Sequence, residues 1–263
     1  IQNITLNASG TTLDLTGQTE GFTITGGAAT DTITAGAGDD TIDGAGGADT
    51  ITGAGGADII SLGSSDSASD VIIFNASSGM DIIQQFTAGA SNGDILKYIG
   101  NLNNNGVSAN SSNGSDGTDD LISADFTLNN QNSHLDIAQL IVGFNTAVTQ
   151  NGLTSGTAID FTGAGISSSQ ILGAIETSLE NTNAGSGNGL LSGASGAQVV
   201  QGAANENRLL LFTDGGSGTA EDVAMVLYNE GGSSEADFSS ELTLASVLKS
   251  VDLSDLTHDN FYG

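Results

Sequence analysis

The sequence predicts a mainly β protein: a right-handed parallel β-roll, or β-solenoid, followed by a smaller α+β C-terminal region. Two observations predict the roll: a large aliphatic residue recurs every nine positions, and glycine-rich segments separate the recurrences. Short strands joined by tight glycine turns fit this spacing, so two repeats would complete one turn of the roll. The aliphatic positions are Leu6, Leu15, Ile24, Ile33, Ile42, Ile51 and Ile60.

An aspartate stands two positions before each of the last four aliphatic residues: Asp31, Asp40, Asp49 and Asp58. Residues two repeats apart stack on the same side, so Asp31 should lie over Asp49, and Asp40 over Asp58. At a strand spacing of ~4.8 Å, two carboxylates repel by about 3 kcal/mol at an effective dielectric near 20. A divalent cation between the turns would remove this repulsion. The repeat therefore predicts a cation-dependent roll.

The donor atoms in this segment select the cation. Carboxylate and backbone carbonyl oxygens are on offer, with no cysteine in the chain and no histidine nearby, which suits Ca²⁺ better than Mg²⁺ or a transition metal. We expect several Ca²⁺ ions between the turns. The candidate metal ligands are Asp31, Asp40, Asp49, Asp58, Gly36, Gly38, Gly44, Gly47, Gly53, Gly56, Asp39 and Asp43.

Residues 26–61 resemble the repeats-in-toxin (RTX) family, whose motif is G-G-x-G-x-D-x-U-x with U a large aliphatic. Four consecutive units, beginning at Gly26, Ala35, Gly44 and Gly53, keep both the aspartate and the isoleucine. Alanine replaces an expected glycine at Ala29, Ala35, Ala45 and Ala54. The resemblance implies a β-roll that binds calcium and belongs to a secreted protein.

The aliphatic ladder begins before the aspartates. Two positions before Ile24, Leu15 and Leu6 stand Phe22, Leu13 and Ile4 in place of an aspartate. We expect these residues to extend the same parallel stack with apolar pairs and without calcium. The roll would then continue a longer solenoid that starts upstream of Ile1.

After Ile60 the period breaks and returns loosely at Asp70, Asp81 and Asp94, each two residues before an aliphatic. The stretch DIIQQFTAGASNGDIL is similar to the segment that closes the roll in secreted RTX proteins. Asp81 and Asp94 would hold a further ion or cap turns. The predicted organisation is a roll with closing strands over 1–100, a polar loop over 101–120, and an α+β region over 121–263.

In the C-terminal region, apolar residues at helical spacing predict helices over 133–148 and 167–181. The segments NRLLLFTD and EDVAMVLYN (207–214 and 221–229) predict two antiparallel strands. The last fourteen residues, SVDLSDLTHDNFYG, are similar to the uncleaved C-terminal signal that RTX proteins present to type I exporters.

The net charge of the chain limits the kinds of molecule that it can bind. Three basic residues against 31 acidic ones give a net charge of −28, so a nucleic-acid partner is close to excluded and anionic membranes are disfavoured. A polyanion with periodic aliphatics fits a fold balanced by bound cations better than disorder. No apolar run approaches the ~18 residues of a membrane span. Without cysteine, a protein outside the cell depends on something other than disulfides.

No active site is predicted. The two histidines, His134 and His258, lie near a helix start and near the chain end, and the sequence carries no nucleophile elbow, zinc-protease motif or phosphate-binding loop. Tryptophan is absent and aromatic residues make up 5% of the chain, which argues against a sugar-cleaving site. We expect that this chain is not an enzyme.

Three functions fit these observations. The first is a calcium-dependent structural protein of the bacterial cell surface, of the S-layer or extracellular-matrix type, which is exported unfolded and then self-associates. The second is the C-terminal export and folding module of a secreted hydrolase or toxin, and the third is the distal part of a large adhesin. The N-terminus lacks Met and any leader pattern, so we expect the C-terminal piece of a longer protein. The segments predicted after residue 130 exceed what an export module requires and favour the first function.

Overall fold

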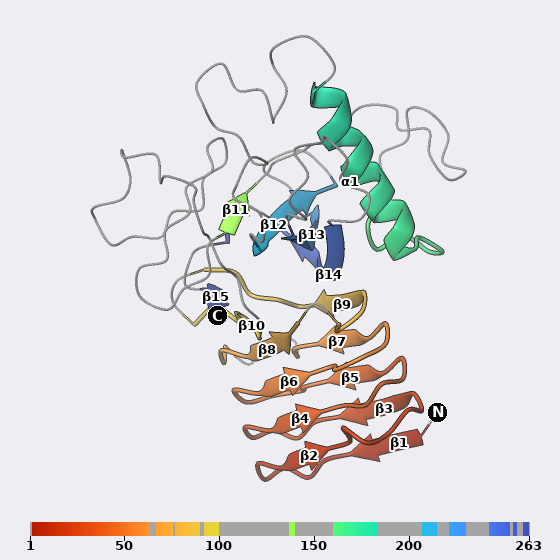
Figure 1. The fold of residues 1–263 in the computed structure, drawn as a ribbon. Helices are drawn as coiled ribbons and strands as arrows, with labels where there is room; N and C mark the ends of the chain where they lie inside the picture. The colour runs from red at the N-terminus through yellow and green to blue at the C-terminus, as the bar shows by residue number, and fades with distance from the viewer. Residues whose placement is uncertain are drawn as a thin grey trace.

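A computed structural model describes residues 2–63, 67–75, 77–89, 92–99, 137–139, 160–183, 207–214, 221–229, 242–252, 255–256 and 260–262. Two stacks of short strands form the N-terminal part, and a longer-stranded sheet with one helix follows (Figure 1). The chain is therefore mainly β, as the nine-residue period predicts. Among the described residues, no helix has the length and apolarity needed to cross a membrane.

Ten short strands build the roll and alternate between two parallel sheets. Odd-numbered strands of the roll pair with one another, as do even-numbered ones, so each full turn adds one strand to each sheet. The strands are β1 (Gln2–Thr5), β2 (Thr12–Asp14), β3 (Phe22–Thr25), β4 (Thr32–Thr34), β5 (Thr41–Asp43), β6 (Thr50–Thr52), β7 (Ile59–Ser61), β8 (Val71–Phe74), β9 (Asp81–Gln84) and β10 (Ile95–Tyr98).

The central residue of each repeat strand points inward. Ile24, Ile33, Ile42, Ile51 and Ile60 are at most 1% exposed and form one core with Ile72, Ile83 and Leu96 of the later strands. Their neighbours in β4 to β6 are mostly threonines, whose β-branched side chains suit the outer face of a strand. Each strand of these repeats thus places one aliphatic side chain in the core and its neighbours on the outer face of the roll.

The first turn of the roll corrects the predicted register. Ile4 pairs with Ile24, and Leu13 with Ile33, so Ile4 and Leu13 occupy the stack positions expected for Leu6 and Leu15. Two additional residues between Leu13 and Ile24 cause the shift, because later core positions are nine apart. Phe22, by contrast, stands where predicted: its backbone N–H donates to Asp40 Oδ1 at 2.7 Å, so it takes the aspartate position of its turn.

One sheet continues from the roll into the C-terminal region. Strand β9 pairs in parallel with β14 (Leu242–Val251), which pairs antiparallel with β13 (Glu221–Asn229), and β13 with β12 (Asn207–Thr213). Strand β11 (Ile137–Gln139) completes a nine-stranded sheet. The predicted β12–β13 hairpin is confirmed, whereas β14, which joins it to the roll, was not predicted.

The two predicted helices have different outcomes. Helix α1 (Ser168–Asn183) forms where the spacing predicts it, with Ile171 and Ile175 fully buried. The helix expected over 133–148 is wrong at 137–139, which form β11, and its other residues lie outside the described part. Parallel pairing with β12 overrides the local helical pattern there. The polar loop over 101–120 also lies outside the described residues.

The chain end closes the second sheet. Strand β15 (Phe261–Tyr262) pairs in parallel with β10, and Phe261 is fully buried. The Asn260 amide donates to the carbonyl of Asp94 at 2.8 Å and its oxygen accepts the N–H of Gly89 at 3.1 Å. The last residues therefore form part of the last turn of the roll.

Two repeat turns carry alanine in a left-handed conformation. Ala45 and Ala54, which stand at the second glycine position of the motif, have φ of +68° and +75°. An L residue with a Cβ is disfavoured there by roughly 1–2 kcal/mol relative to its right-handed conformation. The substitutions of glycine by alanine in these repeats thus store backbone strain in the turns.

We expect Ala45→Gly and Ala54→Gly each to stabilise the folded protein by about 1 kcal/mol, because glycine adopts positive φ without this penalty. The measurement is urea unfolding at fixed calcium. Ala37→Gly is the matched control. Ala37 is also an exposed alanine in a turn, but its φ is not positive, so the change to glycine should slightly destabilise the folded protein. Equal effects at all three positions would contradict the strain assignment.

Candidate calcium-binding rows

The aspartates of the roll form two rows, one on each edge where the chain turns between the sheets. The first aspartate row holds Asp31, Asp49, Asp70 and Asp94, and the second holds Asp40, Asp58 and Asp81. All seven side chains are buried, at most 3% exposed. The four predicted aspartates thus belong to longer rows, which run past the regular repeats.

The same hydrogen bond recurs along both rows. Oδ1 of each aspartate accepts the backbone N–H of the residue at the matching position one turn earlier. In the first row Asp49 accepts from Asp31 at 2.7 Å and Asp70 from Asp49 at 2.7 Å; in the second, Asp58 accepts from Asp40 at 2.8 Å. Each carboxylate therefore joins two turns. The bond also continues at Asp81 and Asp94, beyond the nine-residue period.

The predicted glycine ligands shape these turns in three ways. A Cβ on Gly44 or Gly53 would lie 2.9 Å or 2.2 Å from Oδ2 of the aspartate that ends the same turn, so only glycine leaves room for it. The N–H of Gly36 donates to Asp40 Oδ2 at 3.2 Å. The remaining three contact the backbone of the turn before: Gly38, Gly47 and Gly56.

Asp39 and Asp43, the other two predicted ligands, are exposed and do not join the buried rows. The carboxylate of Asp39 accepts the N–H of Ala57 at 2.9 Å, and that of Asp43 accepts the N–H of Ala45 at 3.0 Å. Both side chains cap turns on the surface. The exposed charge of Asp39 lies near enough to the second row to act on Asp58.

Burial and neighbouring carboxylates disfavour the charged form of two aspartates in the second row. Burial raises the pKa of Asp58 to about 7, with further contributions from the charges of Asp40 and Asp39. Burial, together with the charge of Asp58, raises the pKa of Asp81 to about 8. Oδ2 of Asp58 is buried and has no hydrogen-bond partner among the described residues. An oxygen-only set of buried carboxylates with an unmet acceptor fits a hard divalent cation such as Ca²⁺.

Sequence reasoning missed a second acidic group in the C-terminal region. Carboxylate oxygens of Asp160, Asp214 and Asp222 lie within 4.8 Å of one another. Asp214 accepts the N–H groups of Phe161 and Asp222 at 2.8 Å and 3.1 Å, and burial raises its pKa. These bonds tie the loop before α1 to strands β12 and β13. The three residues lie 54 and 8 positions apart, so no local motif marks them.

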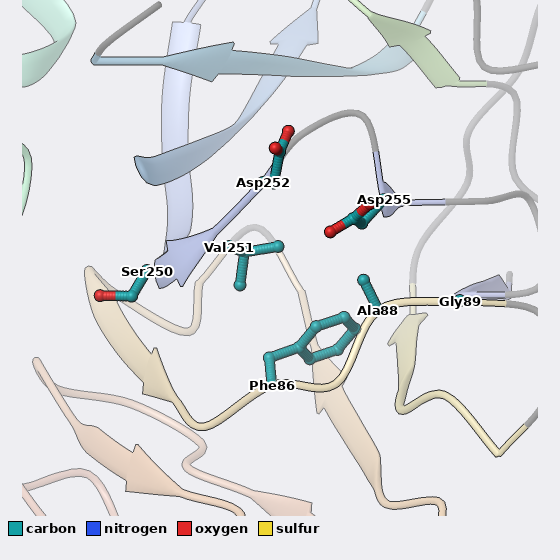
Figure 2. A pocket seen from close by; sticks show the side chains of 7 residues that line it. All are labelled: Phe86, Ala88, Gly89, Ser250, Val251, Asp252 and Asp255. Atoms are coloured by element: carbon teal, nitrogen blue, oxygen red, sulfur yellow. The ribbon is translucent and has the colours of Figure 1, made fainter. Parts of the chain in front are cut away.

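A pocket of about 390 Å³ lies where the turn after β9 meets the end of β14 (Figure 2). Phe86 and Val251 supply apolar walls, and the carboxylate of Asp255 points into the space between them. None of the row aspartates lines it. The pocket is therefore separate from the candidate calcium sites.

Comparison with known proteins agrees with the repeat geometry. Residues 23–63 match the family model described as RTX calcium-binding nonapeptide repeat, in four copies. No curated protein and no solved structure matches the chain. The match ends before Asp70, Asp81 and Asp94, whose place in the rows comes from the structure alone. Residues 23–63 of this chain are RTX calcium-binding nonapeptide repeats.

Proposed function

We propose that this chain is a calcium-dependent structural protein of the bacterial cell surface, of the S-layer or extracellular-matrix type. It is exported unfolded by type I secretion, then folds and self-associates on extracellular calcium. The observation that carries the proposal is the burial of seven aspartates in two rows within a chain of net charge −28. Without cations, folding must bring these carboxylates together out of water, which is strongly unfavourable.

Calcium couples folding to location. The ions bind the native roll and not the unfolded chain, so each site adds about 2.7 kcal/mol of stability at a calcium concentration one hundred times its Kd. In calcium-poor cytosol, repulsion among the acidic residues keeps the chain unfolded and able to pass through an exporter. Outside the cell, higher calcium drives folding. Secretion is typical of proteins with RTX repeats, which supports this order of events.

A structural role, not catalysis, fits the architecture. The nine-stranded sheet runs from the roll into the C-terminal region, because β14 pairs with β13 on one side and with β9 of the roll on the other. Calcium binding in the roll would therefore also order the strand on which the C-terminal part of this sheet docks. We propose that the folded units associate into a lattice or surface layer.

Calcium should control the β-sheet content. Chelation should abolish the β signal in circular dichroism, and added calcium should restore it. The double change Asp40→Ala with Asp49→Ala, which removes one member of each row, should raise the calcium midpoint. Asp14→Ala with Glu20→Ala removes two exposed charges before the aspartate rows and should leave the midpoint near that of the parent. An unchanged spectrum in chelator would exclude calcium-coupled folding.

In chelator, stability should fall as pH rises. The folded pKa values of Asp58 and Asp81, about 7 and 8, exceed the ordinary value of 3.8. Protonated carboxyls are tolerated in the metal-free roll, so their contribution is fully present below pH ~4 and is lost as pH rises through 7 to 8. Circular dichroism in chelator should show more β structure at pH 5.5 than at pH 8. More structure at pH 8 would contradict the burial of these groups.

Self-association is tested by negative-stain microscopy of the full chain. Two-dimensional ordered sheets should appear on addition of calcium and disappear on chelation, and the Asp40→Ala, Asp49→Ala variant should need more calcium to form them. Folded monomers at high protein concentration in calcium would contradict the lattice. That result would favour an export module of a hydrolase or toxin, or the distal part of an adhesin.

A further inference from the structure

The even-numbered strands of the roll present one face to the outside (Figure 1). β2, β4, β6, β8 and β10 stack in that order, and the first and third residues of each point away from the core, because side chains alternate along a strand. In-register pairing aligns these residues in two columns. The first column holds Thr12, Thr32, Thr50, Val71 and Ile95, and the second holds Asp14, Thr34, Thr52, Ile73 and Lys97. These residues form the even-strand face.

The even-strand face is electrically neutral on a strongly acidic chain. The chain has a net charge of −28. Within the face, Asp14 and Lys97 are charged and their charges cancel, and the other residues are threonines or aliphatics, none of them buried. Two polyanions repel each other where their acidic surfaces meet. A second copy of the chain can therefore approach this face without that repulsion.

The two charges stand at opposite ends of the second column. Asp14 lies on β2 and Lys97 on β10, four strand spacings or ~19 Å apart, and Thr52 lies midway between them. Both charged side chains are exposed. The hydroxyl and the backbone N–H of Thr16 donate to Asp14 Oδ1, and these bonds lower the pKa of Asp14. The carboxylate of Asp14 is therefore held in place and charged at neutral pH.

A column that is acidic at one end and basic at the other is complementary to its own reverse. A two-fold axis parallel to the strands and passing at Thr52 would place Asp14 of each copy opposite Lys97 of the other. Thr52 would then lie opposite itself, and the remaining threonines would lie opposite aliphatic residues. The even-strand face thus fits a second copy of itself in both charge and polarity.

The outer face of the odd-numbered strands lacks this complementarity. The residues of β1, β3, β5, β7 and β9 include no basic side chain. The middle strand of the five, β5, carries the exposed Asp43. The same two-fold arrangement on this side would bring the two copies of Asp43 together. The charge pattern therefore favours the even-strand face.

We propose that the even-strand face binds the same face of a second copy of this chain, with Asp14 and Lys97 paired across the interface. The contact rests on the proposed calcium-dependent self-association and identifies one surface that takes part in it. Calcium is required because β2 to β10 form this face only in the folded roll.

The size of the face sets the strength of the contact. Five strands, each contributing three residues, cover roughly 24 Å by 10 Å. A standard stable interface buries about 800 Å² on each partner. A single contact of this kind is therefore weak, which suits a layer in which several contacts act together.

Charge reversal at Lys97 tests the pairing. Lys97→Glu places a carboxylate opposite Asp14, so the dimer Kd measured by sedimentation equilibrium in calcium should rise about tenfold or more. Lys249→Glu is the matched control, because Lys249 is an exposed lysine of β14 and the substitution changes the net charge equally. Its Kd should stay near that of the parent. The double change Lys97→Glu with Asp14→Lys reverses both charges and should restore the parent Kd.

Thr52 offers a second test that leaves Asp14 and its bonds with Thr16 intact. Thr52→Lys brings two ammonium groups together at the axis and should weaken the dimer, whereas Thr41→Lys, on the outer side of β5, should not. Circular dichroism in calcium first establishes that each variant is folded. This pair of variants decides the question if the double charge reversal does not fold.

A parent that stays monomeric at every protein concentration, or a Kd that responds equally to Lys97→Glu and Lys249→Glu, would overturn the contact. If ordered sheets still form in calcium in that case, the proposed surface layer stands and uses other surfaces. A dimer that follows the charge reversal in a chain that forms no sheets would support the contact and count against the layer.

Discussion

Stacked carboxylates at the spacing of neighbouring β-strands are the constraint on which the rest of this fold depends. The roll gains its stability from a narrow aliphatic core, in which each turn adds two isoleucines or their equivalents. The same stacking that aligns the isoleucines also aligns the aspartates two positions before them. The core cannot form without concentrating negative charge along both edges. Cations that neutralise these carboxylates would therefore favour the folding of a chain with this repeat.

The regular part of this arrangement could be predicted from the sequence because period and spacing decide it. An aspartate and an isoleucine in fixed phase over four units determine the strands, the core and the two edges. The prediction for the first turn was shifted by two residues. Leu6 and Leu15 keep the nine-residue spacing from Ile24, but Ile4 and Leu13 are the residues that pair with the next turn, because two additional residues lie between Leu13 and Ile24. A periodic pattern alone does not show which of two aliphatics two residues apart pairs across strands.

The candidate site was predicted less completely than the fold. Asp70, Asp81 and Asp94 follow their partners by 21, 23 and 24 residues, so their place in the rows depends on how irregular turns pack. The pairing of β14 with β9 could not be predicted either, since that contact spans more than 160 residues. Local patterns also misassigned 137–139, where pairing with β12 decides the conformation. Each feature that the sequence did not predict depends on contacts between residues far apart in the chain.

The pairing of β15 with β10 has a consequence for the order of folding. Asn260 bonds to Asp94 across 166 positions, whereas successive turns of the roll close loops of about 20 residues. The entropy of loop closure grows with loop length, so the repeat turns can close early, whereas the last turn needs residues 260–262 from far along the chain. The repeat turns are thus closed by contacts between residues near in the sequence, and the last turn by a contact between residues far apart in it. A chain shortened by only a few residues would keep every repeat and still lack its final strand.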